Sequence, residues 1–205
     1  MAGWQVQQLN FIKKYAMKFL KIFSASLVLI AFMGFVKPEK WFLLKSEHFG
    51  YSVEFPKKPE ENTQVVNSAI GELKMNMFMY DASEGGNDDN VLYLVNCTEY
   101  PDTLVHSDKT EQLEAFFEGA INGAVSNVQG KLLSKKEIQL GQYPGREMSI
   151  DYGNGQAIIR MRMCLVKNVM YMLQTIAETE KDNNASAVRF MDSFELLDSG
   201  AGGSH

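Results

Sequence analysis

The sequence predicts an α+β domain in which an antiparallel β-sheet is sandwiched by a long helix and a C-terminal helix. Short stretches of alternating apolar and polar residues, divided by Gly, Pro and Asn, fill much of the chain after residue 41. One segment near residue 120 has helical periodicity instead, and an Asn154-Gly155 dipeptide marks a tight hairpin. Strands, a long helix, more strands and a short helix, in that order, are typical of this fold class.

Five strands are expected before the long helix. The alternation begins at residues 42–45 and returns at 51–55, where Pro56 and Pro59 follow. Proline donates no hydrogen bond to a sheet, so these two residues end the second strand. The remaining three strands are expected at residues 63–68, 72–81 and 91–99.

The long helix has the clearest pattern in the chain. Apolar residues recur there at spacings of three and four and form one stripe, which predicts that the helix lies on the sheet. Asp108, with Glu111 three residues later, predicts a capping-box start. The stripe consists of Leu113, Phe116, Phe117, Ala120, Ile121, Ala124 and Val128.

The second half of the domain is expected to continue as a strand at residues 132–140, a turn at Tyr143-Pro144-Gly145 and two hairpins. A two-residue loop at Asn154-Gly155 fixes the register of the first hairpin, and a tight turn at Lys167-Asn168 continues it. One face is then apolar and the other polar. The expected pairs are Gly153 with Gln156, Met148 with Met161, Ile150 with Ile159, Glu147 with Arg162, Ser149 with Arg160, Met163 with Met172, Leu165 with Met170, and Cys164 with Tyr171.

The chain is expected to close with a helix at residues 184–194. Apolar side chains at helical spacing again form one side of this segment, and the residues after it are interpreted as a flexible tail, 199–205. The apolar side consists of Ala187, Phe190, Met191 and Phe194.

Three segments resemble the PsbP-like family, which is named for an extrinsic subunit of the photosynthetic oxygen-evolving complex. They are the opening FGYSVEFP at residues 49–56, YPGRE at 143–147 and AVRFMDSF at 187–194. The resemblance covers about residues 42–197 and includes no catalytic signature. It implies a small domain that docks onto other proteins and has no chemistry of its own.

The N-terminal region predicts export. Met17 opens a segment in which Lys18 and Lys21 precede about 15 mostly apolar residues, the layout of a secretory leader. Residues 1–16 are interpreted as a mis-assigned start or an extension, 17–40 as a signal peptide or N-terminal anchor, and 41–198 as a single domain. The apolar run is shorter than the roughly 20 residues that span a bilayer, which favours a cleaved signal. The expected location is therefore periplasmic or extracellular, with contact to the membrane only through an uncleaved leader.

The charge balance argues against nucleic acid as a partner. Residues 1–40 contain six lysines and one glutamate, a net charge of +5, which leaves −10 for residues 41–205 out of −5 overall. A phosphate-binding groove needs clustered Lys and Arg, which the domain lacks.

The expected binding residues lie on the polar face of the hairpins. The register places Arg160 and Arg162 beside Glu147 and Asp151, with Tyr171 nearby, and this group forms either a binding patch or a solvated sheet face. The leading hypothesis is an accessory domain that binds another envelope protein through this face. The alternative is a carrier of a small apolar ligand in a pocket lined by Met and Phe.

No catalytic residue, metal site or cofactor is predicted. His48 and His106 have no partner at a diagnostic spacing, and the twelve methionines suit Cu(I) less well than they suit core packing under the long helix. Cys97 and Cys164 each lie in an expected strand, where apolar packing is favoured over a disulfide.

Overall fold

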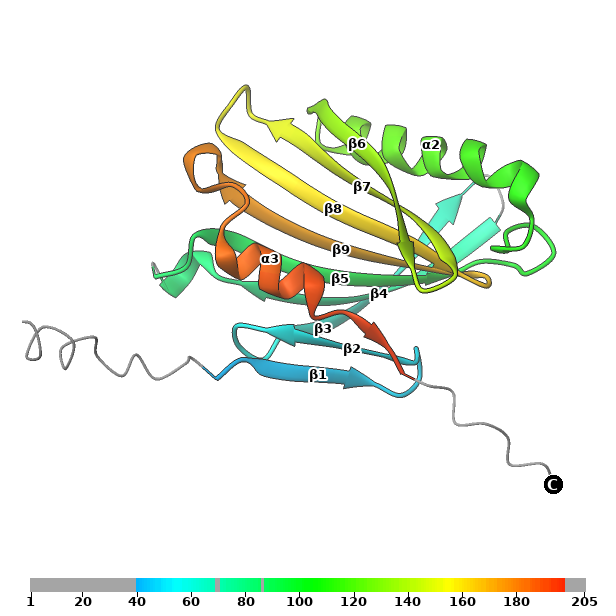
Figure 1. Cartoon of the computed structure of the whole chain (residues 1–205), viewed down its shortest axis with the longest axis horizontal. Coiled ribbons are helices and arrows are strands. Elements are labelled where there is room, and N and C mark those ends of the chain that lie inside the picture. Colours follow the sequence, from blue (N-terminus) through cyan, green and yellow to red (C-terminus); the bar gives the residue numbers. More distant parts are fainter. Residues whose placement is uncertain (1–39, 69–70, 86, 198–205) are drawn as a thin grey trace, which may run out of the picture. The chain divides into compact units, whose positions relative to one another are not determined.

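A computed structural model describes residues 40–68, 71–85 and 87–197 (Figure 1). The interpretations of residues 1–39 and of the C-terminal tail lie outside this part of the chain. The described residues form a seven-stranded and a three-stranded sheet, both antiparallel. The large sheet has the order β3-β4-β5-β9-β8-β7-β6, with β3 at Glu60–Ser68, β4 at Gly71–Asp81, β5 at Asn90–Glu99, β6 at Lys131–Leu140, β7 at Tyr143–Tyr152, β8 at Ala157–Val166 and β9 at Val169–Glu178.

The predicted α+β class and its order of elements are confirmed. Between the strands lie α2 at Thr110–Asn127, α3 at Ala185–Asp192 and two 3₁₀ turns, η1 at Ser83–Gly85 and η2 at Thr179–Lys181. The Asn184 side chain accepts a hydrogen bond from the Ala187 N–H (2.9 Å) and so begins α3.

The first two strands belong to a separate sheet, which the sequence did not indicate. β2 (Tyr51–Phe55) pairs with β1 (Phe42–Ser46) on one side and with the short β10 (Glu195–Leu196) on the other. The Pro56–Pro59 segment follows β2 directly, and the next strand, β3, pairs only with β4. The small sheet therefore joins the two ends of the described domain.

The predicted register of both hairpins is confirmed. Seven of the eight expected pairs occur in the β7–β8–β9 ladder, and the eighth, Gly153 with Gln156, lies in the turn that follows the last ladder pair, Tyr152 with Ala157. Asn154 and Gly155 both have positive φ (54° and 90°), as the tight turn of a two-residue hairpin requires.

The turn predicted at Tyr143-Pro144-Gly145 is wrong, because these residues begin β7 and the chain reverses at Gly141 (φ 60°) and the residue after it. Pro144 fits this strand because β7 pairs with β8 only from Gly145 onward. Gly145 allows β7 to lie close to β8, since a Cβ atom at this position would lie 2.5 Å from the Met163 carbonyl oxygen.

The predicted capping box of the long helix is also wrong. Helix α2 starts two residues after Asp108, at Thr110, and its N-cap residue Lys109 makes no side-chain capping bond. The Asp108 backbone N–H instead donates to His106 Nδ1 (3.2 Å), which holds this segment in a turn. The apolar stripe is confirmed, with Phe117 and Ile121 fully buried.

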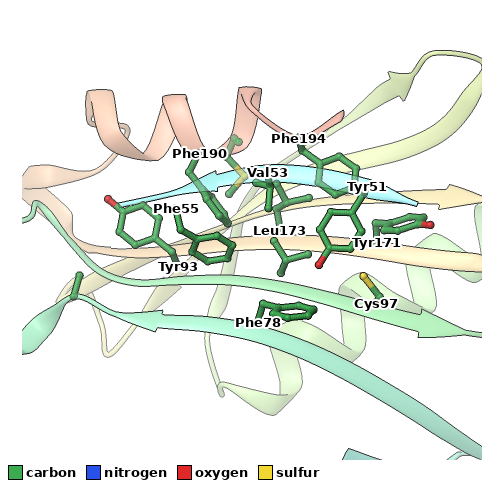
Figure 2. Packing of buried hydrophobic residues seen from close by; sticks show 13 residues of the cluster. Tyr51, Val53, Phe55, Phe78, Tyr93, Cys97, Tyr171, Leu173, Phe190 and Phe194 are labelled. Atoms are coloured by element: carbon green, nitrogen blue, oxygen red, sulfur yellow. The ribbon is translucent and has the colours of Figure 1, made fainter. Parts of the chain in front are cut away.

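Alternate residues of the central strands enter two separate hydrophobic clusters. On β9, Tyr171 and Leu173 pack with β2 and α3, whereas Met170 packs with α2. Figure 2 shows the first cluster, in which Phe190 and Phe194 reach toward the side chains of β2. The large sheet thus contributes residues to both clusters, one shared with α2 and the other shared with β2 and α3.

Cys97 and Cys164 are free thiols on strands that both neighbour β9. Each is paired with Tyr171 in the ladder, one from each side, so their Cα atoms are about 10 Å apart, beyond the reach of a disulfide. Burial raises the pKa of Cys97 to about 12 and that of Cys164 to about 11, so both thiols stay protonated at neutral pH.

Candidate functional site

A cleft of about 350 Å³ lies between the C-terminal half of α2 and the large sheet. The residues around it are mostly apolar and none of them is charged. Five methionines supply much of the lining: Met75, Met161, Met163, Met170 and Met172.

The cleft follows from the shapes of the helix and the sheet. Adjacent strands are about 4.8 Å apart, so seven strands span on the order of 29 Å, whereas a helix with its side chains is about 10 Å across. Large side chains, Phe117 and Ile121, bring α2 onto the sheet through one cluster. Toward its C-terminus the helix presents Ala120, Gly123 and Ala124 to the cleft, and these residues are too small to fill the space.

The methionines of β4 are less covered than the sequence predicts. Met79 is 40% exposed, Met75 and Met77 are half-buried, and none of the three packs in either hydrophobic cluster. Met161, Met163 and Met170 on β8 and β9 are buried as expected.

Arg146 fixes the N-terminal half of α2 against the sheet. Its guanidinium lies 4.8 Å from the centre of the Phe117 ring and forms ion pairs with Glu114 and, at 3.5 Å, with Glu137. It also donates to the Gly145 carbonyl oxygen (2.9 Å). One wall of the cleft is therefore held in place by contacts outside the cleft itself.

Two polar residues lie in the lining on β5. Asn96 is only 3% exposed and Thr98 is 4% exposed, although both face an apolar space. The Asn96 Nδ2 atom donates to Thr98 Oγ1 (3.2 Å), and Asn96 Oδ1 has no hydrogen-bond partner among the described residues. Sequence analysis missed them; the available signal was two polar residues alternating with Val95 and Cys97 in an otherwise apolar strand.

The predicted binding residues Glu147, Arg160 and Arg162 lie on the other face of the sheet. Arg162 contacts Glu147 (2.9 Å) and Asp192 (3.0 Å) and donates to the Met191 carbonyl oxygen (2.8 Å) at the end of α3. Arg160 makes two hydrogen bonds to Asp182, at 2.6 and 2.7 Å. Both guanidinium groups are therefore already paired within the domain.

The electrostatics of this group fit a set of internal ion pairs. Burial acts to raise the pKa of Glu147, but hydrogen bonds from Lys136 and Arg162 outweigh it, and the pKa lies below its usual value. Hydrogen bonding to Asp182 raises the pKa of Arg160.

The structure does not bring Asp151 and Tyr171 into this group. The Asp151 carboxylate accepts from the Gly155 N–H (2.6 Å) and closes the hairpin turn. Tyr171 is 4% exposed, and its hydroxyl donates to the Phe49 carbonyl oxygen (2.6 Å), because β2 and Phe194 cover this part of the sheet. The expectation that Tyr171 forms part of an exposed patch is wrong.

The described residues contain no cluster of three or more His, Cys, Asp or Glu that could hold a metal ion. His106 lies near Asp102 (3.6 Å) and Asp108 (3.5 Å) in an exposed loop, and His48 packs against Phe49. Neither described α-helix has the length and apolar character to cross a membrane.

Comparisons with known proteins show distant structural similarity to solved structures. No family model matches the chain, and no curated protein matches it. The solution structure of cyanobacterial PsbP (CyanoP) from Synechocystis sp. PCC 6803 is similar with a TM-score of 0.48 and 12% identity, over 80% of this chain and 96% of that chain. A protein of unknown function, PA94 from Pseudomonas aeruginosa, gives a TM-score of 0.30 and 8% identity, over 69% and 85%.

Proposed function

We propose that this chain is an exported, non-enzymatic binding domain with a PsbP-like fold, in which the large sheet is sandwiched between α2 and α3 and the cleft under α2 carries a small apolar ligand. The cleft is the observation that supports this function most strongly. Its volume of about 350 Å³ is within the usual size of small-molecule sites, which starts near 300 Å³. The secretory leader that the sequence predicts at residues 17–40 supports a role outside the cytoplasm.

The chemistry of the lining fits such a ligand. Met side chains are unbranched and adapt to ligands of different shape. Each CH₂ group that leaves water contributes about 0.8 kcal/mol, so an eight-carbon chain contributes on the order of 6 kcal/mol before the cost of immobilisation. A contribution of about 6 kcal/mol corresponds to a Kd of about 40 µM, and the cost of immobilisation raises this value, so binding between about 40 µM and the millimolar range is the expected result.

Titration with N-phenyl-1-naphthylamine, a neutral apolar dye whose fluorescence rises in apolar surroundings, tests this proposal. The protein should bind the dye with saturation, and Ala124→Phe, which places a ring in the cleft, should weaken binding at least tenfold. Ala115→Phe is the matched control, because Ala115 lies on the same helix but is exposed and outside the cleft. Equal affinities for the two variants would contradict the assignment of the cleft.

A second candidate function is the docking of another envelope protein at α3, and exposed Val188 favours it. Val188 is 42% exposed and lies beside Arg160 and Arg162 in a shallow pocket of about 220 Å³. Reversing both arginine charges would disrupt this face itself, because new carboxylates would then lie beside Glu147 and Asp182.

Val188→Glu is therefore the variant for testing docking. Crosslinking and affinity capture from the native envelope should lose a specific protein with Val188→Glu and retain it with Val91→Glu, a control at another exposed valine (40%). Melting temperatures of both variants should stay close to that of the wild type. A capture profile that Val188→Glu leaves unchanged argues against docking at α3.

A further inference from the structure

We propose that the cleft under α2 selects ligands that combine an apolar body with one uncharged hydrogen-bond donor, and that Asn96 Oδ1 accepts this hydrogen bond. This inference rests on the proposed carrier function and specifies its ligand class. Alcohols, phenols and simple amides belong to that class, whereas pure hydrocarbons and fatty-acid anions do not.

The first support for this inference is the position of the Asn96 side chain. Asn96 lies on an interior strand of the large sheet, where β5 pairs it with Met77 of β4 and Met172 of β9. Its neighbours in the chain, Val95 and Cys97, enter the opposite cluster, so its own side chain extends toward α2. Asn96 is 3% exposed, yet it lines the cleft.

The second support is the Asn96 Oδ1 atom, which has no hydrogen-bond partner among the described residues. Buried polar groups in proteins nearly always have hydrogen-bond partners, so an exception requires an explanation. The amide nitrogen of Asn96 is occupied by Thr98 Oγ1 (3.2 Å), while Oδ1 has no partner among the described residues. A ligand that enters the cleft with an O–H or N–H group would supply the missing donor.

The third support is that the residues lining the cleft are uncharged. A charged group that leaves water needs an opposite charge or several hydrogen bonds to offset its desolvation. The residues around the cleft include no Asp, Glu, Lys, Arg or His. A neutral head group is therefore the chemistry that this site accommodates.

Displacement of N-phenyl-1-naphthylamine by 1-octanol and 1-fluorooctane tests the inference. These two probes have the same chain, but only the alcohol has a donor. The quantity measured is a ratio: the concentration of fluorooctane that displaces half of the dye, divided by the corresponding concentration of octanol. Because the two probes differ in hydrophobicity, this ratio is compared between variants and is not interpreted on its own. The ratio should fall about tenfold from the wild type to Asn96→Leu, which keeps the branched shape and the number of side-chain heavy atoms and removes the acceptor.

Asn127→Leu is the matched control, since Asn127 also lines the cleft but is exposed on α2. This variant should keep the wild-type ratio. Asn96→Ala provides the same comparison with a smaller side chain should Asn96→Leu fold poorly. Octanoate at pH 7.5 should displace the dye much less effectively than octanol.

The outcomes separate the two proposals. If both probes displace the dye but Asn96→Leu leaves the ratio unchanged, or Asn127→Leu removes the preference instead, the role of Asn96 is overturned and the carrier function stands. Displacement by octanoate that equals displacement by octanol overturns the restriction to neutral ligands. If the dye does not bind, or if neither octanol nor fluorooctane displaces it, both the carrier function and this inference fail.

Discussion

Replacement of Phe117 by alanine is expected to lower the free energy of unfolding by about 3 to 5 kcal/mol. The Phe117 side chain is fully buried and packs in the cluster that joins α2 to β7, β8 and β9. Its ring also lies 4.8 Å from the Arg146 guanidinium, which would lose that contact. Urea unfolding monitored by circular dichroism measures the change.

Phe116→Ala is the matched control, because it removes the same side chain from the next residue of the same helix. Phe116 is half-buried and contacts the rings of Tyr100 and Phe117 at centroid distances of 5.2 and 5.7 Å. Its replacement should cost about 1 to 2 kcal/mol. A greater loss for Phe116→Ala than for Phe117→Ala would mean that α2 is rotated from the orientation described.

Gly145→Ala is expected to destabilise the domain by about 3 kcal/mol, even though the change adds only one methyl group. That methyl carbon would lie 2.5 Å from the Met163 carbonyl oxygen and 2.8 Å from Cys164 Sγ. The carbonyl belongs to β8, which cannot move without breaking its pairing with β7 and β9. Thermal and urea unfolding of the purified variant test this expectation.

Gly119→Ala is the comparison for the same chemical change at an open position. Gly119 is exposed inside α2, and apart from its chain neighbours and the surrounding helix backbone no described atom lies within 4 Å of the added Cβ. Alanine there should raise stability by about 0.5 to 1 kcal/mol, because glycine lowers the stability of a helix interior. A neutral Gly145→Ala variant would show that β7 and β8 do not approach each other as closely as described.

Local sequence signals predicted the parts of the fold that local chemistry determines. Asn154-Gly155 predicted the register of β7 with β8, including the ion pair between Glu147 and Arg162, and the turn at Lys167-Asn168 predicted that of β8 with β9. The spacing of Phe117 and Ile121 identified the buried side of α2.

Contacts between distant segments account for the features that the sequence did not reveal. Tyr171 was expected on a polar face because of its register. Two segments cover it instead: β2, which is more than a hundred residues earlier in the chain, and Phe194, which is about twenty residues later. Whether a helix spans a whole sheet face depends on the number of strands, which only the assembled sheet establishes. The cleft and the burial of Asn96 could not be predicted for that reason.

The central claim is that apolar ligands enter the cleft under α2, and nuclear magnetic resonance of ¹³C-methyl-labelled methionine tests it most directly. Met163, Met170 and Met172 line the cleft, whereas Met191 lies in the cluster on the opposite face of the sheet. Addition of N-phenyl-1-naphthylamine should shift the first three methyl signals and leave that of Met191 in place. Shifts confined to Met191, or no shift of any methionine signal at saturating dye, would contradict the account.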